Sequence, residues 1–264
     1  MVVFSDLDRS IIYSKKFIQE ESNPLDIEIY KGENISYISR KTIENIKKIE
    51  KNSDFIPTTT RTIEQFKRID FKKYGLDFKH VITSNGGNIL IDGEIDIEYK
   101  YFIDEKLKLS SYISDIIKLF KEYKNINGIK KFRVAENLFF YIVVDEERFD
   151  LNNLNSFTEK IRDLNWDVYI SGRKIYFLPR EIKKSTALKY ICDKYGYKNT
   201  FAIGDSTMDG DMLNFCNYSY ILRHGDFVNY IKRGDKFIIS DKKGFQGSEE
   251  ILDKVILCQN NLKF

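Results

Sequence analysis

Short apolar runs alternate with helical patterns near both ends of the chain, and this alternation constrains the fold more than any other feature. The strand-like runs are residues 1–4, 54–57, 79–83, 200–203 and 218–222. Between them, apolar residues recur at helical spacing, as at Ile43, Ile46 and Ile49. Strands that alternate with helices indicate a parallel sheet covered by helices. We therefore expect a Rossmann-like, doubly wound α/β core.

The middle of the chain has a different pattern. Asp92-Gly93 separates two short apolar runs, which is typical of a two-residue hairpin turn. The elements expected here are strands at 88–91 and 95–99, a long helix over 105–123, strands near 132–134 and 139–144, a helix near 154–164, and a hairpin that turns at 171–172. Their order predicts an antiparallel sheet with helices on one face.

Together these patterns predict a core that is interrupted by an inserted domain. The core covers residues 1–87 and 180–264, and an α+β cap covers residues 88–179. A separate alternating segment, residues 26–38 around Gly32, predicts a small hairpin between the first strand and its helix. Two positions are open for this hairpin. It lies beside the functional edge of the sheet, or it is a solvent-facing addition without a role there.

Four polar motifs adjoin the apolar runs of the core. They are Ser5-Asp6-Leu7-Asp8-Arg9-Ser10, Thr58-Thr59-Thr60-Arg61, Lys183-Lys184-Ser185-Thr186 and Gly204-Asp205-Ser206-Thr207-Met208-Asp209. Each motif alone is common in turns and helix caps. Ligands of open parallel sheets bind beyond the carboxyl ends of the strands, and all four motifs can meet there. Their joint occurrence predicts an acidic site with one lysine.

Composition excludes several other classes of protein. The 43 basic and 40 acidic side chains give a net charge of only +3, so nucleic acid is not an expected partner. No long apolar span is present, and we expect a cytoplasmic protein with no membrane association. Three widely spaced cysteines indicate neither a zinc site nor a disulfide framework. The oligomeric state is not indicated.

The four motifs resemble those of the haloacid dehalogenase superfamily of hydrolases. The resemblance is greatest to the branch with a large α+β cap of the C2 type, which includes Cof-like, sucrose-phosphatase-like and mannosyl-3-phosphoglycerate-phosphatase-like enzymes. It covers nearly the whole chain, and it includes residues 84–87 at the entrance to the cap and residues 242–245 near the end. The resemblance implies the core and cap described above.

The chain departs from the family pattern at several positions. Arg9-Ser10 stands where the family often has Gly-Thr, and Met208 stands where it often has Asn. Thr60 and Ser185 replace two further glycines. The acids that the family uses are retained, so these departures bear on substrate choice more than on chemistry.

The resemblance implies a role for each motif. Asp6 is the nucleophile, Asp8 is the general acid and base, and Thr59 and Lys184 contact the phosphoryl oxygens. A carboxylate that attacks a phosphate meets repulsion of about 4 kcal/mol per unit pair at roughly 4 Å and an effective dielectric near 20. Mg²⁺ would cancel it. The expected metal ligands are Asp6, Asp205 and Asp209, with Asp8 through its backbone carbonyl.

Substrate contacts are implied for Arg61 and Asn85, and the cap residues Lys130, Lys131, Arg133 and Arg173 are candidate selectors. We therefore expect a Mg²⁺-dependent phosphatase that acts on a small phosphorylated metabolite, with a sugar phosphate as the first candidate. Two alternatives stay open. One is a phosphotransferase or phosphomutase on the same scaffold, and the other is a non-catalytic protein that binds a phosphorylated ligand.

Overall fold

The central element of the fold is a parallel sheet. The computed structural model describes residues 1–18, 23–122 and 127–262. In this part of the chain the sheet consists of β1 (Val2–Ser5), β4 (Asp54–Pro57), β12 (Thr200–Gly204), β13 (Tyr218–Ile221) and β14 (Phe237–Ile239). Their order is β14-β13-β12-β1-β4, and every pairing is parallel. Because β1 lies between β12 and β4, the residues that follow it have a neighbouring strand end on each side at the sheet's carboxyl edge.

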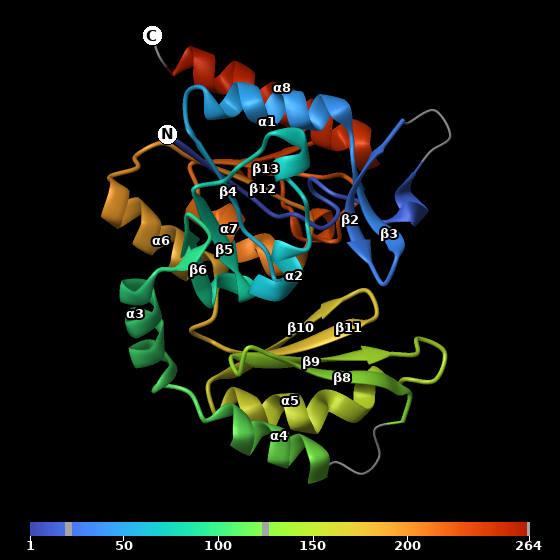
Figure 1. Cartoon of the computed structure of the whole chain (residues 1–264). Coiled ribbons are helices and arrows are strands. Elements are labelled where there is room, and N and C mark those ends of the chain that lie inside the picture. The colour runs from blue at the N-terminus through green and yellow to red at the C-terminus, as the bar shows by residue number, and fades with distance from the viewer. Residues whose placement is uncertain (19–22, 123–126, 263–264) are drawn as a thin grey trace.

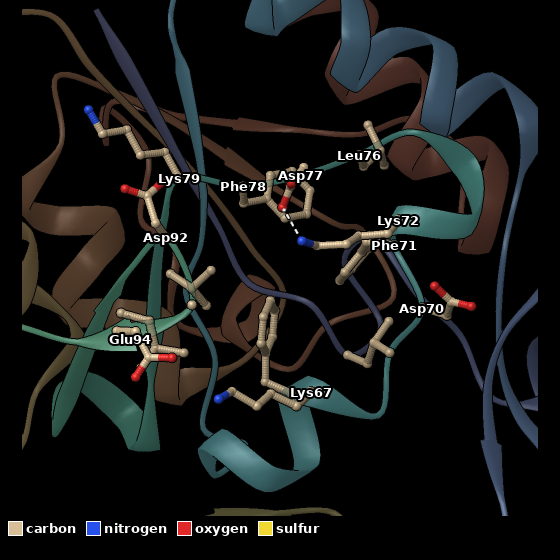
Figure 2. Close-up of a pocket in the computed structure, with 15 residues that line it drawn as sticks. Lys67, Asp70, Phe71, Lys72, Leu76, Asp77, Phe78, Lys79, Asp92 and Glu94 are labelled. Carbon is tan, nitrogen blue, oxygen red and sulfur yellow. Dashed lines mark ion pairs between the residues drawn. The ribbon is translucent and has the colours of Figure 1, made fainter.

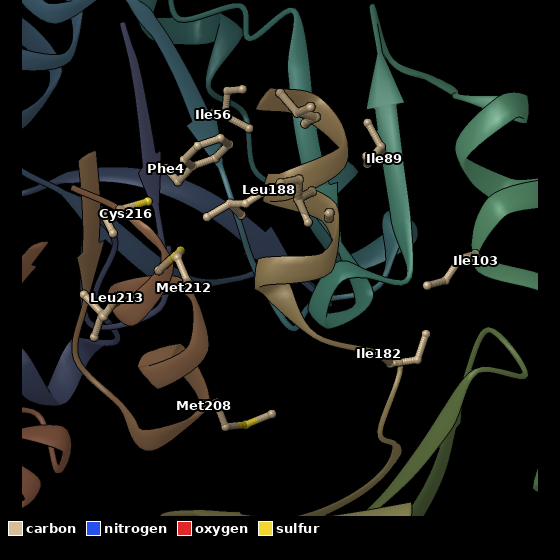
Figure 3. Packing of buried hydrophobic residues seen from close by; sticks show 14 of the residues in the cluster. Phe4, Ile56, Ile89, Ile103, Ile182, Leu188, Met208, Met212, Leu213 and Cys216 are labelled. Atoms are coloured by element: carbon tan, nitrogen blue, oxygen red, sulfur yellow. The ribbon is translucent and has the colours of Figure 1, made fainter. Parts of the chain in front are cut away.

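Helices cover both faces of this sheet. They are α1 (Arg40–Glu50) and α8 (Gly244–Asn261) on one face, with α6 (Lys184–Tyr195) and α7 (Gly210–Phe215) on the other (Figure 1). Successive strand residues point to opposite faces, so Val3 packs in the cluster of α1 and α8, whereas Phe4 packs with Leu188 and Met212 (Figure 3). The expected doubly wound α/β core is confirmed.

A second, antiparallel sheet lies beyond the carboxyl edge of the first. Among the described residues it consists of β8 (Ile129–Ala135), β9 (Phe139–Val144), β10 (Trp166–Ser171) and β11 (Lys174–Pro179), in the order β10-β11-β9-β8. Helices α4 (Ile113–Glu122) and α5 (Asn155–Arg162) cover the face that points away from the core (Figure 1). Phe120 and Phe157 of these helices pack against Phe140 and Phe177. The expected antiparallel sheet with helices on one face is therefore present.

The segment between the two sheets packs mainly on the core side. A small sheet of β5 (His80–Thr83), β6 (Asn88–Ile91) and β7 (Glu94–Ile95) precedes α3 (Ile97–Leu107). Tyr99 and Phe102 of α3 pack against Tyr190 of the core helix α6, and Asp96 pairs with Lys194 of the same helix at 3.0 Å. The division into residues 1–87 with 180–264 and residues 88–179 stays a proposal, and these contacts favour a cap that begins after α3.

Three expected elements differ from the structure. The strand over 95–99 ends at Ile95, because the Asp96 carboxylate accepts bonds from two backbone N–H groups and starts α3. The helix over 105–123 is two helices, α3 and α4, and residue 123 lies outside the described residues. The strand over 79–83 does not join the parallel sheet as a full member. β5 pairs with β6, and a parallel bridge joins its Ile82 to Thr58, the residue that follows β4.

The predicted hairpin over 26–38 is present as β2 (Leu25–Tyr30) and β3 (Glu33–Ile38), which pair in antiparallel fashion. It lies beside the short helix α2 (Ile63–Lys67), at the carboxyl edge of the parallel sheet (Figure 1). Of its two expected positions, the one beside the functional edge therefore agrees with the structure. None of the helices in the described ranges combines the length and the apolar character that a membrane span requires.

Candidate active site

Three carboxylates and one lysine meet at the carboxyl edge of the sheet. Asp6 follows β1, Asp205 follows β12, Asp209 lies in the turn after Asp205, and Lys184 begins α6. Lys184 Nζ donates to Asp6 Oδ1 at 2.7 Å and to Asp209 Oδ1 at 2.6 Å. Gly204 permits this arrangement, because a Cβ there would lie 2.7 Å from the Asp209 Cβ. The structure thus brings together four residues from three motifs that are far apart in the sequence.

Burial determines the electrostatics of this cluster. Lys184 and Asp209 are fully buried, and Asp6 is only 7% exposed. Burial, with the nearby Asp209, raises the pKa of Asp6 to about 7 despite the opposing charge of Lys184. Burial, followed by the charges of Asp209 and Asp6, raises the pKa of Asp205 well above its ordinary value. Burial lowers the pKa of Lys184, but Asp209 and Asp6 outweigh this and hold it above its ordinary value. A further cation beside these acids would stabilise their ionised forms.

The donor set fits a divalent cation. One oxygen from each of Asp6, Asp205 and Asp209 lies within 4.8 Å of the others. Asp209 Oδ2 already accepts from the Asp205 N–H and from Ser206, whereas Asp205 Oδ2 is buried and accepts no hydrogen bond from any described residue. Its nearest cation, Arg9 Nε, lies 3.3 Å away without forming a hydrogen bond, and a buried carboxylate oxygen that accepts no hydrogen bond favours a bound cation. Asp6 and Asp205 are therefore better direct ligands than Asp209.

The Arg9 guanidinium lies beside the acidic cluster, close to Asp205. Its Nε lies 3.3 Å from Asp205 Oδ2, its Nη2 donates to the His224 carbonyl at 2.8 Å, and its guanidinium lies over the Phe17 ring. The backbone of Arg9 has a φ of +65°, a region that suits glycine and disfavours other residues. The sequence pattern marked position 9 as a departure from glycine, and the structure places its side chain against the acidic cluster.

Asp8 points to a second cluster, formed with Arg61 and the hairpin. Arg61 Nε and Nη2 hold the two Asp8 oxygens at 2.7 and 2.8 Å, and Arg61 Nη1 binds Glu28 Oε2 at 2.8 Å. Glu28 is 1% exposed and also accepts from Ser36 Oγ at 2.6 Å and from Arg68 Nε at 3.3 Å. Partial burial raises the pKa of Asp8, but Arg61 outweighs it and holds that pKa below its ordinary range.

Two other expected site residues, Thr59 and Asn85, are buried and do not line the cavity beside the acidic cluster. Thr59 is fully buried, its N–H donates to the Ile82 carbonyl, and its Oγ1 accepts from the Arg61 N–H. Asn85 is also buried, and its side-chain amide donates to the Ile182 carbonyl at 3.1 Å. The neighbour of Thr59, Thr60, lines the cavity described next. The phosphoryl contact expected of Thr59 and the substrate contact expected of Asn85 stay predictions.

A cavity of about 370 Å³ opens between the acidic cluster and the cap. Its core wall includes Asp6, Asp8, Arg9, Lys184 and Asp205, and its cap wall is the β10–β11 turn. That turn carries Arg173, which the sequence singled out, and Lys174, which it did not. The sequence feature that could have identified Lys174 is its position beside the predicted hairpin turn at 171–172.

The other expected cap selectors do not line this cavity. Lys130 pairs with Asp145 at 3.0 Å, and Arg133 lines a different cavity. Larger cavities lie elsewhere, including one of about 550 Å³ beside α2 and β5. Figure 2 shows its apolar floor around Phe71 and Phe78 and its charged rim, where Lys72 pairs with Asp77. The buried acids and Lys184 line the smaller cavity. We therefore identify the candidate active site by the chemical groups that line it and not by the volume of the cavity.

Comparison with known proteins agrees with this geometry. The phosphoglycolate phosphatase of Methanobrevibacter smithii is 23% identical over 185 residues, which cover 67% of this chain and 74% of that protein. The structure of the sucrose-phosphatase from Synechocystis sp. PCC6803, in complex with sucrose and phosphate, aligns with a TM-score of 0.70 over 98% of both chains at 15% identity. The subclass IIB sugar phosphatase BT4131 aligns with a TM-score of 0.63 over 96% of this chain and 97% of that one at 13% identity.

The two structural likenesses concern the fold, since both identities are low. Family membership comes from the sequence itself. The model of a family described as haloacid dehalogenase-like hydrolase matches residues 96–228, which is half of the chain. The chain therefore belongs to the haloacid dehalogenase-like hydrolases.

Proposed function

We propose that the chain is a Mg²⁺-dependent phosphatase that hydrolyses a small phosphorylated metabolite through an aspartyl phosphate on Asp6. The observation that carries this proposal is the buried group of Asp6, Asp205 and Asp209 around Lys184, which opens into a cavity under the cap. Its volume of about 370 Å³ is near the lower end of the roughly 300–1,000 Å³ of ligand pockets, which favours a small substrate. The names of the relatives favour a sugar phosphate or another small phosphomonoester.

Hydrolysis through a phosphorylated aspartate takes two steps. In the first, an Asp6 oxygen forms a bond to phosphorus, the bond from phosphorus to the leaving oxygen breaks, and Asp8 gives a proton to that oxygen. In the second, Asp8 takes a proton from water, the water oxygen attacks phosphorus, and the Asp6–phosphorus bond breaks to release phosphate. Lys184 stabilises the negative charge on Asp6 and on the phosphoryl oxygens throughout.

The metal site is proposed at the acidic cluster. Asp6 and Asp205 would hold the cation with the backbone carbonyl of Asp8, and Asp209 would orient Lys184 and the Asp205 loop. When bound, Mg²⁺ supplies charge that offsets the repulsion between the Asp6 carboxylate and the phosphate dianion. Carboxylate and carbonyl oxygens are the ligands that this hard cation prefers.

Asp8 needs a proton in the first step, and its pairing with Arg61 opposes this. Asp8 therefore has to separate from Arg61 when substrate binds. Its side chain is 51% exposed and lines the cavity, so it has room to turn, whereas Arg61 is 13% exposed and is held by the buried Glu28. The hairpin thus keeps Arg61 in place while Asp8 changes partner.

The experiment is phosphate release from 4-nitrophenyl phosphate and a panel of sugar phosphates, with Mg²⁺ and with chelator. We expect release only with Mg²⁺, and Asp6→Asn should abolish it while the circular dichroism spectrum stays unchanged. Asp115→Asn, which changes an exposed acid on the cap, is the matched control and should keep full activity. Turnover by Asp6→Asn at the native rate would refute the nucleophile assignment. Transfer of phosphate to an added alcohol without free phosphate would identify a phosphotransferase instead.

A further inference from the structure

The cap wall of the cavity is a rigid turn with two adjacent cations. Ser171 pairs with Lys174 across a two-residue β10–β11 turn, and the Arg173 carbonyl accepts from the Val144 N–H at 2.9 Å. A two-residue hairpin turn that is also tied to the neighbouring strand fixes the backbone from which Arg173 and Lys174 project. Both side chains line the cavity, and both are exposed. Their position opposite the acidic cluster is therefore built into the cap.

These two cations differ from three cations on the core side, each of which has a carboxylate partner; the core-side Lys16 also lines the cavity and lies over the Phe17 ring. Lys184 is held by Asp6 and Asp209, Arg61 by Asp8 and Glu28, and Arg9 lies 3.3 Å from Asp205. Arg173 and Lys174 form no ion pair within 4 Å of any carboxylate of the described residues. Lys174 lies over the Tyr141 ring, and Tyr176, followed by the more distant Asp8, raises its pKa. The acids of the cavity therefore all lie on the core wall, whereas the cap wall contributes two cations and no carboxylate.

An unbalanced positive wall is matched by a negative ligand group. The reacting phosphoryl group has to lie at Asp6, on the core wall, so the cap wall faces the other part of the substrate. An uncharged alcohol would leave Arg173 without a counter-charge, and Lys174 with only Asp8, whose two oxygens Arg61 already holds. The low-dielectric walls of a cleft strengthen the field of such cations. A carboxylate or a second phosphate would satisfy them through charge-assisted hydrogen bonds.

We propose that the substrate is a phosphomonoester whose leaving group carries a second anionic group, and that Arg173 and Lys174 bind this group. This inference rests on the proposed phosphatase function and names its substrate class. The anionic group is a carboxylate or a phosphate, since both match the donors of Arg and Lys. The cavity limits the leaving group to a short chain or a single ring.

The test compares three esters that differ only at the far end of a three-carbon chain. They are propyl phosphate, 3-phosphonooxypropanoate and propane-1,3-diyl bisphosphate. We expect kcat/KM to be at least about tenfold higher for one or both anionic esters than for propyl phosphate, as a charge-assisted hydrogen bond implies. Arg173→Gln and Lys174→Gln should each lower this ratio by about tenfold, mainly through KM. The two anionic arms distinguish a carboxylate from a phosphate.

Lys131→Gln is the matched control, because Lys131 is an exposed basic residue of the cap that does not line the cavity. It should leave the ratio unchanged. A wild-type preference for propyl phosphate, or a ratio that Arg173→Gln and Lys174→Gln leave intact, would overturn the proposal. An equal loss for all three esters would also overturn it, since the cations would then serve the reacting phosphoryl group.

Binding without turnover separates this inference from the proposed function. Calorimetry of the same three esters with Asp6→Asn should give the same ranking of affinities. If the wild-type chain hydrolyses no ester while Asp6→Asn still binds the anionic esters more tightly, the proposed function fails and the anion site stands. If neither measurement favours the anionic esters, the anion site fails.

Discussion

Glu28→Gln tests whether the hairpin holds Arg61 in place. Glu28 is a fully buried carboxylate that accepts from three donors, which belong to Arg61, Arg68 and Ser36. A glutamine of the same shape has one acceptor oxygen, and its NH₂ group would face a donor. The substitution therefore removes the charge and leaves at least one buried donor unpaired.

The expected loss follows from what each arginine retains. Removing one partner of a buried ion pair costs about 3–5 kcal/mol. Arg61 keeps Asp8, and Arg68 is 28% exposed and can turn to solvent, so the lower end applies. We expect the free energy of unfolding to fall by about 3 kcal/mol, which corresponds to a Tm lower by roughly 6–12 °C for a chain of this size.

Urea unfolding gives the stability, and the slope of the transition should stay unchanged. Glu33→Gln removes the same charge from an exposed position of the same hairpin and should cost less than about 0.5 kcal/mol. A loss below about 1 kcal/mol for Glu28→Gln, or one equal to that of Glu33→Gln, would refute the reasoning.

A kinetic readout separates positioning from simple destabilisation. A misplaced Arg61 would disturb Asp8, whose proton matters most for a poor leaving group. We expect kcat in Glu28→Gln to fall more for an alkyl phosphate than for 4-nitrophenyl phosphate, whose leaving group needs little protonation. Equal losses for both esters would argue against an effect through Asp8.

Three further outcomes can be checked by simple measurements. Because the pKa of Asp6 is raised to about 7, the metal-free folded chain binds a proton that the unfolded chain releases near pH 4, so its stability should fall as the pH rises from 5 to 8. Asp6→Asn should flatten this Tm profile, and Mg²⁺ should bind about tenfold more tightly at pH 8 than at pH 6 by calorimetry. Arg9→Gly should tighten Mg²⁺ binding by about tenfold, since it removes a cation that competes for Asp205. Gly86→Ala should lower Tm far more than Gly93→Ala: both have positive φ, but only at Gly86 does the new Cβ meet a carbonyl, that of Lys183 at 2.1 Å.

The helix expected over 105–123 shows where periodicity alone fails. The apolar periodicity continues across residues 108–112, but Ser110 Oγ donates to the Asn165 carbonyl at 2.9 Å, and the Ser111 carbonyl accepts from Trp166 Nε1 at 2.9 Å. These partners lie 55 residues away, so no local pattern reports them. The parallel core was predictable by contrast, because each strand and helix carries its own period.

The acidic cluster was predictable for a related reason. Asp6 and Asp205 directly follow strands, and Lys184 begins a helix, so the topology of a parallel sheet brings them to one edge whatever their distance in sequence. The cap selectors lacked such a rule. Lys131 and Arg173 are both basic residues of the cap, and only the orientation of the cap sheet decides that Arg173 reaches the cavity.

The burial of Glu28 was not predicted, because an irregularity in strand β2 turns its side chain to the buried face. In 25–30 the regular alternation would bury Ile27 and Ile29 and expose Glu28. Register shifts on both sides of Glu28 break that alternation, so Ile27 and Glu28 are both buried while Ile29 is 59% exposed. The buried Glu28 carboxylate can therefore bind Arg61 as its second partner beside Asp8. Residues placed by the ends of regular elements can be inferred from sequence, whereas residues placed by a bulge require the pairing register, which only the folded chain supplies.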